Sequence, residues 1–230
     1  MAGNGVSPMA EARVALQAFP SRAAADAALA DRLAPLLRAA ASERGEARLV
    51  VSGGTSPIGL FHALGVMPLP WRRIRVIPSD ERKVPAQHPE RNEAMIRREL
   101  LQGPAAAASL ASLLPPDPLL LEGPGQLDAV ILGMGPDGHT ASLFPGSPEL
   151  PRALASRNSL HELSVPHAAL ARISLTPHAL LQTDALFLLI FGNEKREVFE
   201  MAMEDGEKTE LPVRAVLHQA SVPVDVFWAP

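Results

Sequence analysis

Short apolar runs alternate with longer segments of helical spacing along most of the chain. Four runs, at 49–51, 74–77, 129–132 and 185–191, are continuous and partly β-branched, which is typical of strands buried on both faces. A further apolar run at 224–228 predicts a final strand. Alternation of this kind indicates an α/β fold in which helices cover both faces of a mostly parallel sheet.

Three segments between these runs have the spacing of helices: 21–41, 91–101 and 193–203. The first has Ser21 as a candidate N-cap, and Pro35 should kink or divide it. Asn193 is a candidate cap for the last. The Ala-, Pro- and Leu-rich segment 103–125 predicts a short helix and a loop. Since neither a repeat nor a strong linker is evident, we expect a single domain over 1–230 with a frayed terminus at about 1–10.

Composition narrows the class of protein. Apolar residues make up 47% of the 230 residues and charged residues 20%, which is enough for a folded core. A net charge of −4 argues against a nucleic-acid backbone as partner, but leaves room for a local basic pocket. The absence of cysteine excludes disulfides, thiolate metal sites and a cysteine nucleophile. With no signal peptide and no apolar run long enough to span a membrane, we expect a cytoplasmic protein without a membrane partner.

Ligands of parallel sheets bind outside the carboxyl ends of the strands, and four of these junctions are polar. In the first, Gly53 and Gly54 are followed by Thr55 and Ser56. Such a loop can turn several N–H groups toward one anion, although an ordinary capped turn has the same composition. It is not a Walker A loop, because no lysine follows the glycines. The second junction, 79–83, holds two acids and two bases, which form either a solvated turn or part of a site.

The third junction is the richest in chemistry. Gly133, Gly135 and Gly138 fall within six residues, so the backbone can approach a ligand closely. Asp137 and His139 lie two positions apart in the same loop. A histidine can take a proton from water near neutral pH, and a carboxylate can orient its ring and stabilise the imidazolium. A turn with a surface histidine is the alternative.

In the fourth junction the strand ends in Gly192, and Lys195 falls in the first turn of the following helix. A cation is disfavoured there by the helix dipole, unless it shares an anion with the helix end. A solvent-exposed lysine is the alternative. The chain shows no histidine spacing typical of a metal site, no serine-hydrolase elbow and no dinucleotide fingerprint in its proper place.

In their order along the chain, these segments resemble the 6-phosphogluconolactonase family. The resemblance is carried by Ser-Gly-Gly-Thr-Ser-Pro at 52–57, Ser-Asp-Glu-Arg-Lys-Val at 79–84, Gly-Met-Gly-Pro-Asp-Gly-His-Thr-Ala-Ser-Leu-Phe-Pro-Gly at 133–146, Arg-Ile-Ser-Leu-Thr at 172–176 and Gly-Asn-Glu-Lys at 192–195. It extends from about residue 19 to 228. It implies hydrolysis of 6-phospho-glucono-1,5-lactone to 6-phosphogluconate, without a cofactor or a metal. It also implies the three-layer α/β/α fold shared with glucosamine-6-phosphate deaminase.

The resemblance also implies roles for individual residues. His139 would be the general base that activates water, supported by Asp137. We expect backbone N–H groups of the glycine loop to stabilise the developing oxyanion. The expected substrate-binding residues are Gly53, Gly54, Thr55, Ser56, Asp80, Arg82, Asn92, Arg172 and Lys195. The chain departs from the family at 91–93, where Arg-Asn-Glu replaces the usual Ser-Asn-Tyr and only Asn92 transfers.

Two other functions remain open. A deaminase or isomerase of the same fold would carry a glutamate where this chain has Phe144, and a phenylalanine cannot exchange protons. A sugar-phosphate sensor should bring a helix-turn-helix, but only about 18 residues precede the first expected element. We therefore expect an enzyme with a small-molecule substrate, acting as a monomer or a weak homodimer.

Overall fold

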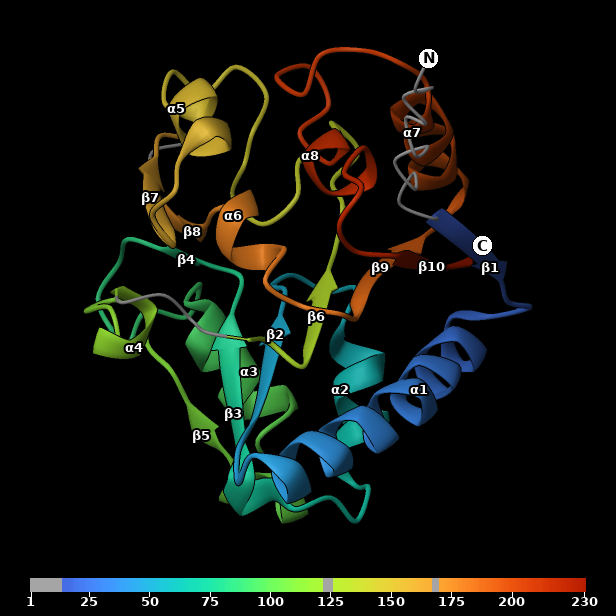
Figure 1. Ribbon diagram of the computed structural model, residues 1–230, viewed down its shortest axis with the longest axis vertical. Coiled ribbons are helices and arrows are strands. Elements are labelled where there is room, and N and C mark those ends of the chain that lie inside the picture. Colours follow the sequence, from blue (N-terminus) through green and yellow to red (C-terminus); the bar gives the residue numbers. More distant parts are fainter. Residues whose placement is uncertain (1–13, 122–125, 167–169) are drawn as a thin grey trace, which may run out of the picture.

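The computed structural model describes residues 14–121, 126–166 and 170–230. The expected frayed terminus at 1–10 lies outside these ranges. Within them, seven strands form one parallel sheet (Figure 1). Their order across the sheet is β1 (Val14–Ala18), β10 (Val224–Ala229), β9 (Leu186–Phe191), β6 (Ala129–Leu132), β2 (Ala47–Val51), β3 (Ile74–Pro78) and β5 (Ser109–Leu110). The five strands expected from the apolar runs are confirmed.

Alternate residues of the central strands pack on opposite faces of the sheet. In β9, Phe187 and Leu189 face one core, and Leu186 and Leu188 face the other. The first core is covered by α1 (Arg22–Glu43), α2 (Ile58–Gly65) and α3 (Asn92–Glu99). The second is covered by α6 (Pro177–Leu180), α7 (Asn193–Met203) and α8 (Arg214–Leu217). The three-layer α/β/α architecture is therefore confirmed, and it explains why these strands are apolar on both faces.

Two helix predictions need correction: Pro35 does not divide α1 and Asn193 does not cap α7, while a kink at Pro35 stays a prediction. Helix α1 begins after Ser21, whose side chain accepts from the N–H of Ala24 as expected, but Pro35 does not divide it. Leu33 and Leu37 on either side of the proline are buried against the sheet, and this packing keeps the helix continuous. In α7 the cap is Gly192 with φ of +89°, and Asn193 is the first helical residue. A strand that turns this sharply into a helix requires a glycine at the cap.

A second, smaller sheet was not expected from the sequence. It contains β4 (Asp80–Arg82), β8 (Arg172–Leu175) and β7 (Leu160–Leu163), in that order and antiparallel. Beside it lies α5 (Leu150–Ala155), which contacts β7. These strands are three or four residues long and carry several charged side chains, so they lack the apolar signal of the larger sheet.

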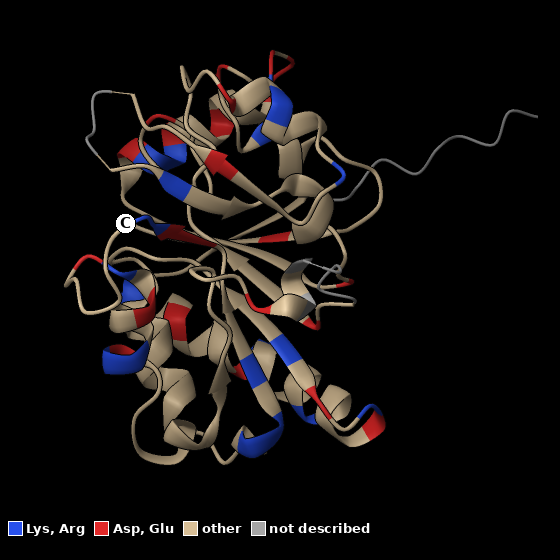
Figure 2. Cartoon of the chain, turned by 90° about the vertical axis from the view of Figure 1, so that its left-hand side faces the viewer, with Lys and Arg blue, Asp and Glu red and all other residues tan. Residues whose placement is uncertain are grey.

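The remaining segments are short connections. A 3₁₀ turn, η1 (Trp71–Arg73), precedes β3. The segment 103–125 contains another, η2 (Gly103–Ala107), then β5 and α4 (Pro118–Leu121), and its residues 122–125 lie outside the described ranges. Basic and acidic segments are interspersed in the view of Figure 2. None of the helices in the described ranges has both the length and the apolar character needed to cross a membrane.

Candidate active site

The four polar junctions follow four neighbouring strands. The order β9, β6, β2, β3 is continuous in the large sheet, so their carboxyl ends meet at one edge. A cavity of about 270 Å³ lies there. Of the expected site residues, Gly53, Gly54, Thr55, Ser56, Asp80, Arg82, Asn92, His139, Arg172 and Lys195 line it. The structure thus brings together residues from both sheets that are far apart in the sequence.

Asp137 does not line the cavity but holds the histidine that does. Its Oδ1 lies 2.5 Å from Nδ1 of His139 and also accepts the His139 N–H at 3.2 Å. Burial alone would raise the pKa of Asp137, but the hydrogen bonds and charge of His139 outweigh it and hold that pKa below its ordinary value. An ionised carboxylate can only accept, so Nδ1 carries a proton, and in the neutral form of the ring the lone pair is therefore on Nε2. This is the tautomer that a general base requires.

The loop leaves just enough room for this pair. A Cβ on Gly135 would lie 2.2 Å from two ring atoms of His139 and 2.6 Å from Oδ1 of Asp137, so only glycine fits. On another side, the ring of Phe144 lies 4.2 Å from that of His139, measured between centroids. Ala141, which also lines the cavity, has a φ of +49°, a left-handed conformation that is costly for a residue with a Cβ. The backbone is therefore strained where it meets the cavity.

Two of the N–H groups expected to stabilise an oxyanion are already engaged. The N–H of Gly135 donates to the carbonyl of His139 at 2.9 Å, and that of Gly138 donates to the carbonyl of Gly135 at 3.1 Å. These bonds close the loop around the histidine. Neither group is free to donate to a substrate while the loop keeps this form.

Three basic side chains line the cavity from different elements. Arg82 and Arg172 are direct cross-strand partners in the small sheet, and Lys195 lies in the first turn of α7. Burial, and then the charge of Arg82, lower the pKa of Arg172. Burial, and then the charge of Arg22, lower the pKa of Lys195. The charges of Arg82 and Arg172 oppose each other until an anion neutralises them, so the basic side of the cavity is suited to bind phosphate.

Further donors surround this cation cluster. The Nε of Arg172 is buried and has no hydrogen-bond partner within the described part of the chain. Nζ of Lys195 lies 3.5 Å from Oγ of Ser56, in the loop between β2 and α2. In that loop Gly53 approaches the Asn92 amide so closely that a Cβ would lie 2.2 Å from its Oδ1. The glycine loop, the lysine and the arginines thus line one cavity with groups that can donate to an anion.

Asp80 is buried, and other side chains occupy its carboxylate. Its Oδ1 accepts from Oγ of Ser79 at 2.9 Å and from Nδ2 of Asn92 at 3.4 Å, and its Oδ2 accepts from Oγ of Ser142 at 2.5 Å. Ser142 belongs to the loop after β6, so this bond joins that loop to the small sheet. Asp80 borders the cavity, but these contacts favour a role in holding its two walls together.

Sequence reasoning missed the residues that support the site from behind. Glu81 and Arg91 are buried next to the cavity, although charge runs usually indicate solvated turns. The signal available for Glu81 was its place directly after a buried strand, in a segment already selected as a junction. Within the described ranges, no three His, Asp or Glu side chains gather into a cluster that could hold a metal ion.

Comparisons with known proteins find relatives that match over nearly the whole chain. A relative from Mesorhizobium japonicum, named 6-phosphogluconolactonase, is 42% identical over 227 residues, covering 93% of this chain and 94% of its own. A relative of the same name from Pseudomonas aeruginosa is 39% identical, covering 95% and 96%. The crystal structure of a 6-phosphogluconolactonase from Shewanella baltica matches with a TM-score of 0.90 and 34% identity, covering 95% of this chain and 98% of that one.

More distant structures share the fold. A monomeric glucosamine-6-phosphate deaminase matches with a TM-score of 0.73 at 17% identity, over 92% of this chain. The family model described as glucosamine-6-phosphate isomerases/6-phosphogluconolactonase matches residues 20–228. The chain therefore belongs to the glucosamine-6-phosphate isomerase/6-phosphogluconolactonase family.

Proposed function

We propose that this protein is a 6-phosphogluconolactonase, an enzyme that hydrolyses 6-phospho-D-glucono-1,5-lactone to 6-phospho-D-gluconate. The observation that carries the proposal is that a carboxylate-held histidine and three half-buried cations line one cavity. The relatives named for this activity match the chain over nearly its whole length. A phosphorylated lactone has both features that such a cavity recognises, a dianionic phosphate and an electrophilic carbonyl.

In the proposed reaction, Nε2 of His139 takes a proton from water as the water oxygen attacks the lactone carbonyl. Asp137 stabilises the imidazolium that forms. When the tetrahedral intermediate collapses, the bond between C1 and the ring oxygen breaks, and the imidazolium returns the proton to that oxygen. The product carboxylic acid loses its proton to solvent. No residue other than His139 has to change its protonation state.

Substrate binding is assigned to the basic side of the cavity. Arg82, Arg172 and Lys195 neutralise the phosphate, and the loop from Gly53 to Ser56 donates N–H and hydroxyl groups. Because the phosphate keeps its charge throughout the reaction, these contacts are made equally in the ground state and the transition state. They should therefore set KM more than kcat.

Phe144 favours hydrolysis over deamination. It packs against the His139 ring at the position where the deaminases carry a glutamate for proton transfer. An apolar ring there can shape the cavity and shield the imidazole, but it offers no second proton carrier. The site thus has the single base that hydrolysis needs.

The test is hydrolysis of freshly generated 6-phosphogluconolactone, coupled to 6-phosphogluconate dehydrogenase and corrected for spontaneous opening. Unphosphorylated gluconolactone is the control substrate. A large enzyme-dependent rate confined to the phosphorylated lactone is the expected result. A rate no higher than background, together with thermal stabilisation by 6-phosphogluconate, would contradict the enzyme and leave a sugar-phosphate-binding protein.

Other expectations stay predictions from the sequence. They are the single-domain organisation, the monomeric or weakly dimeric state, the cytoplasmic location, and the absence of a nucleic-acid partner and of a cofactor.

A further inference from the structure

A charged network lies buried behind the small-sheet side of the cavity. The Glu81 side chain is fully buried and that of Arg91 is 2% exposed. Oε1 of Glu81 accepts the backbone N–H groups of Arg82 at 2.7 Å and Asn92 at 2.8 Å. Oε2 accepts the N–H of Glu93 at 2.9 Å. One carboxylate therefore binds the backbone of two cavity-lining residues, on β4 and at the start of α3.

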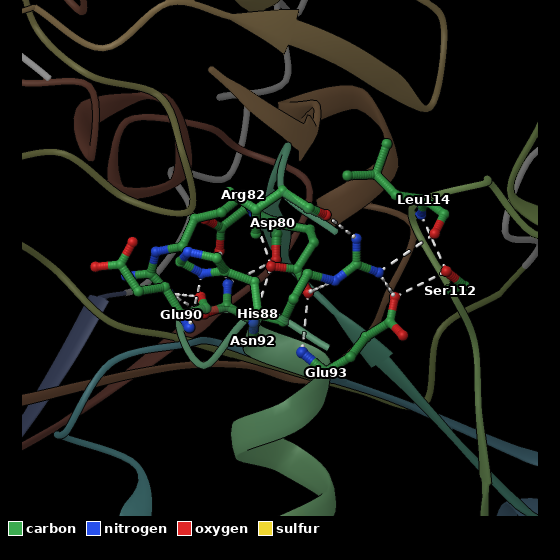
Figure 3. A network of polar contacts seen from close by, with 11 residues as sticks. Asp80, Arg82, His88, Glu90, Asn92, Glu93, Ser112 and Leu114 are labelled. Atoms are coloured by element: carbon green, nitrogen blue, oxygen red, sulfur yellow. Dashed lines mark hydrogen bonds and ion pairs between the residues drawn. The ribbon is translucent and has the colours of Figure 1, made fainter. Parts of the chain in front are cut away.

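The side chains of those two residues depend on this backbone. Nη1 of Arg82 donates to Oδ1 of Asn92 at 2.7 Å and to the carbonyl of Glu90 at 2.8 Å. Nδ2 of Asn92 donates to the carbonyl of Asp80 at 2.7 Å. Figure 3 shows Asp80, Arg82 and Asn92 gathered together, with Glu93 on the opposite side of the network. A shift of the Asn92 backbone would thus displace the Arg82 guanidinium as well.

Arg91 supplies the charge that Glu81 needs in this environment. Its Nε lies 3.5 Å from Oε2 of Glu81, and its Nη2 donates to Oε1 of Glu93 at 2.7 Å. It also donates to the carbonyls of Val84 at 3.2 Å and Leu114 at 3.3 Å. The guanidinium is therefore fixed by four separate groups.

The charge on Glu81 matters because only the ionised form accepts all three N–H groups. Burial raises the pKa of Glu81, opposed by the three backbone donors and by Arg91. A protonated carboxyl would point an O–H at donors that need an acceptor. Without Arg91 the buried carboxylate would lose its ion-pair partner and keep only the charge of Arg172, which favours its protonation or its displacement toward water.

We propose that Arg91 is a positioning residue for ligand binding, which acts through Glu81 to fix the backbone of Arg82 and Asn92 at the anion-binding side of the cavity. The proposal rests on the proposed function only for the identity of the ligand.

The main test compares Arg91→Met, at the residue that precedes α3, with Arg98→Met, a matched change within α3 at a side chain that is 60% exposed. KM and kcat are measured with 6-phosphogluconolactone, and Kd for 6-phosphogluconate by calorimetry. In Arg91→Met we expect KM and Kd to rise about tenfold, which is the size of effect found for residues that orient a binding residue without touching the ligand. The value of kcat should stay within about twofold of that of the wild type. Arg98→Met should behave as the wild type.

Amide hydrogen exchange followed by NMR gives a reading without any ligand. The N–H groups of Arg82 and Asn92 should exchange about tenfold faster in Arg91→Met, because they lose their acceptor. The N–H of Val130 in β6 is the internal reference and should not change. A general loss of stability would instead speed exchange at all three positions.

A second variant covers the case in which Arg91→Met does not fold. Glu81→Gln combined with Arg91→Met removes both buried charges and keeps the side-chain volumes, so no charge is left uncompensated. It should fold and still show the higher KM and the faster exchange at Arg82 and Asn92. Arg91→Lys, which keeps the charge but not the planar fork, should lie between the wild type and Arg91→Met.

Wild-type KM, Kd and exchange in the folded double variant would overturn the proposal. Failure of the proposed function looks different. If the wild type does not hydrolyse the lactone, while exchange at Arg82 and Asn92 still depends on Arg91, the reaction assignment fails and the positioning role stands.

Discussion

The two walls of the cavity are built over very different distances along the chain. We call the residues 133–142 after β6 the loop wall, and β4, β8 and Asn92 the sheet wall. In the loop wall His139 is held by Asp137, two positions away. In the sheet wall Arg82 pairs with Arg172 across two strands, and Ser142 joins the two walls by reaching Asp80, 62 positions away.

The proposed base therefore lies in the loop wall, and the arginines proposed to bind phosphate lie in the sheet wall. A short loop can hold a base and its partner in one arrangement, because few torsions separate them. A cation cluster needs positive charges from several elements, since adjacent side chains on one strand point to opposite faces. Changes in the loop wall should therefore reduce kcat, and changes in the sheet wall should raise KM.

The largest effect is expected from His139→Ala in the loop wall. Removing the base should lower kcat by at least about 10²-fold, with KM changed much less. The measurement is the steady-state rate with 6-phosphogluconolactone after subtraction of spontaneous hydrolysis. Turnover close to that of the wild type would refute the assignment of the base.

In the sheet wall, Arg172→Met should raise KM by about 10- to 100-fold and leave kcat nearly unchanged, because a charged hydrogen bond to phosphate is lost in both states. Arg157→Met, at an exposed arginine outside this cavity, is the control. If Arg172→Met instead lowers kcat alone, the separation between the two walls does not hold.

Lys195→Ala tests a cation that belongs to neither wall. Its flexible side chain acts as a point charge, so KM should rise by about tenfold, less than for the arginine. Competitive inhibition by inorganic phosphate should weaken in parallel. Unchanged inhibition together with a lower kcat would place Lys195 at the reacting carbonyl.

The smallest effect concerns stability and lies outside both walls. Burial raises the pKa of Asp26 in α1 from 3.8 to about 6, opposed by the Leu60 N–H and Arg22. As the pH rises from about 4 to 6, the Asp26 carboxyl ionises in the unfolded chain while it stays protonated in the folded protein. The free energy of unfolding therefore falls over this range and stays lower above pH 6. Asp26→Asn has no carboxyl group to ionise at this position. Its free energy of unfolding, relative to that of the wild type, should therefore rise by about 1–3 kcal/mol from pH 4 to pH 7.

Urea unfolding at the two pH values measures this gain. Asp31→Asn, at an exposed position of the same helix, is the control and should show no such pH dependence. The values of kcat and KM should change little in Asp26→Asn, because Asp26 affects the stability of the protein and belongs to neither wall of the cavity. A difference in unfolding free energy of the same size at both pH values would mean that folding does not raise the pKa of Asp26.

The large sheet was predictable because burial on both faces leaves a continuous apolar run in the sequence. The strands β2, β3, β6 and β9 all carry this mark. The strand β4 reads Asp-Glu-Arg and becomes a strand only by pairing with β8, so no local pattern reveals it. The same holds for β1 at the sheet edge, where three of the five residues are partly buried and two are exposed.

The candidate site divides in the same way. The positions of His139 and of the glycine loops followed from motifs at strand ends. The burial of Glu81 and Arg91 did not, because a charged residue is recognised as buried only when its distant partners are known. Pro35 and Asn193 show the converse, since packing and a sharp turn override what their residue types favour locally.

The placement of β10 has a consequence for the synthesis of this protein. Within the described ranges β1 joins the sheet only through β10, which lies between it and β9. The residues 14–18 are synthesised before their partner at 224–229, which lies more than two hundred residues further along the chain. The nascent chain must therefore carry an unpaired strand until residues 224–229 have been made and can pair with it.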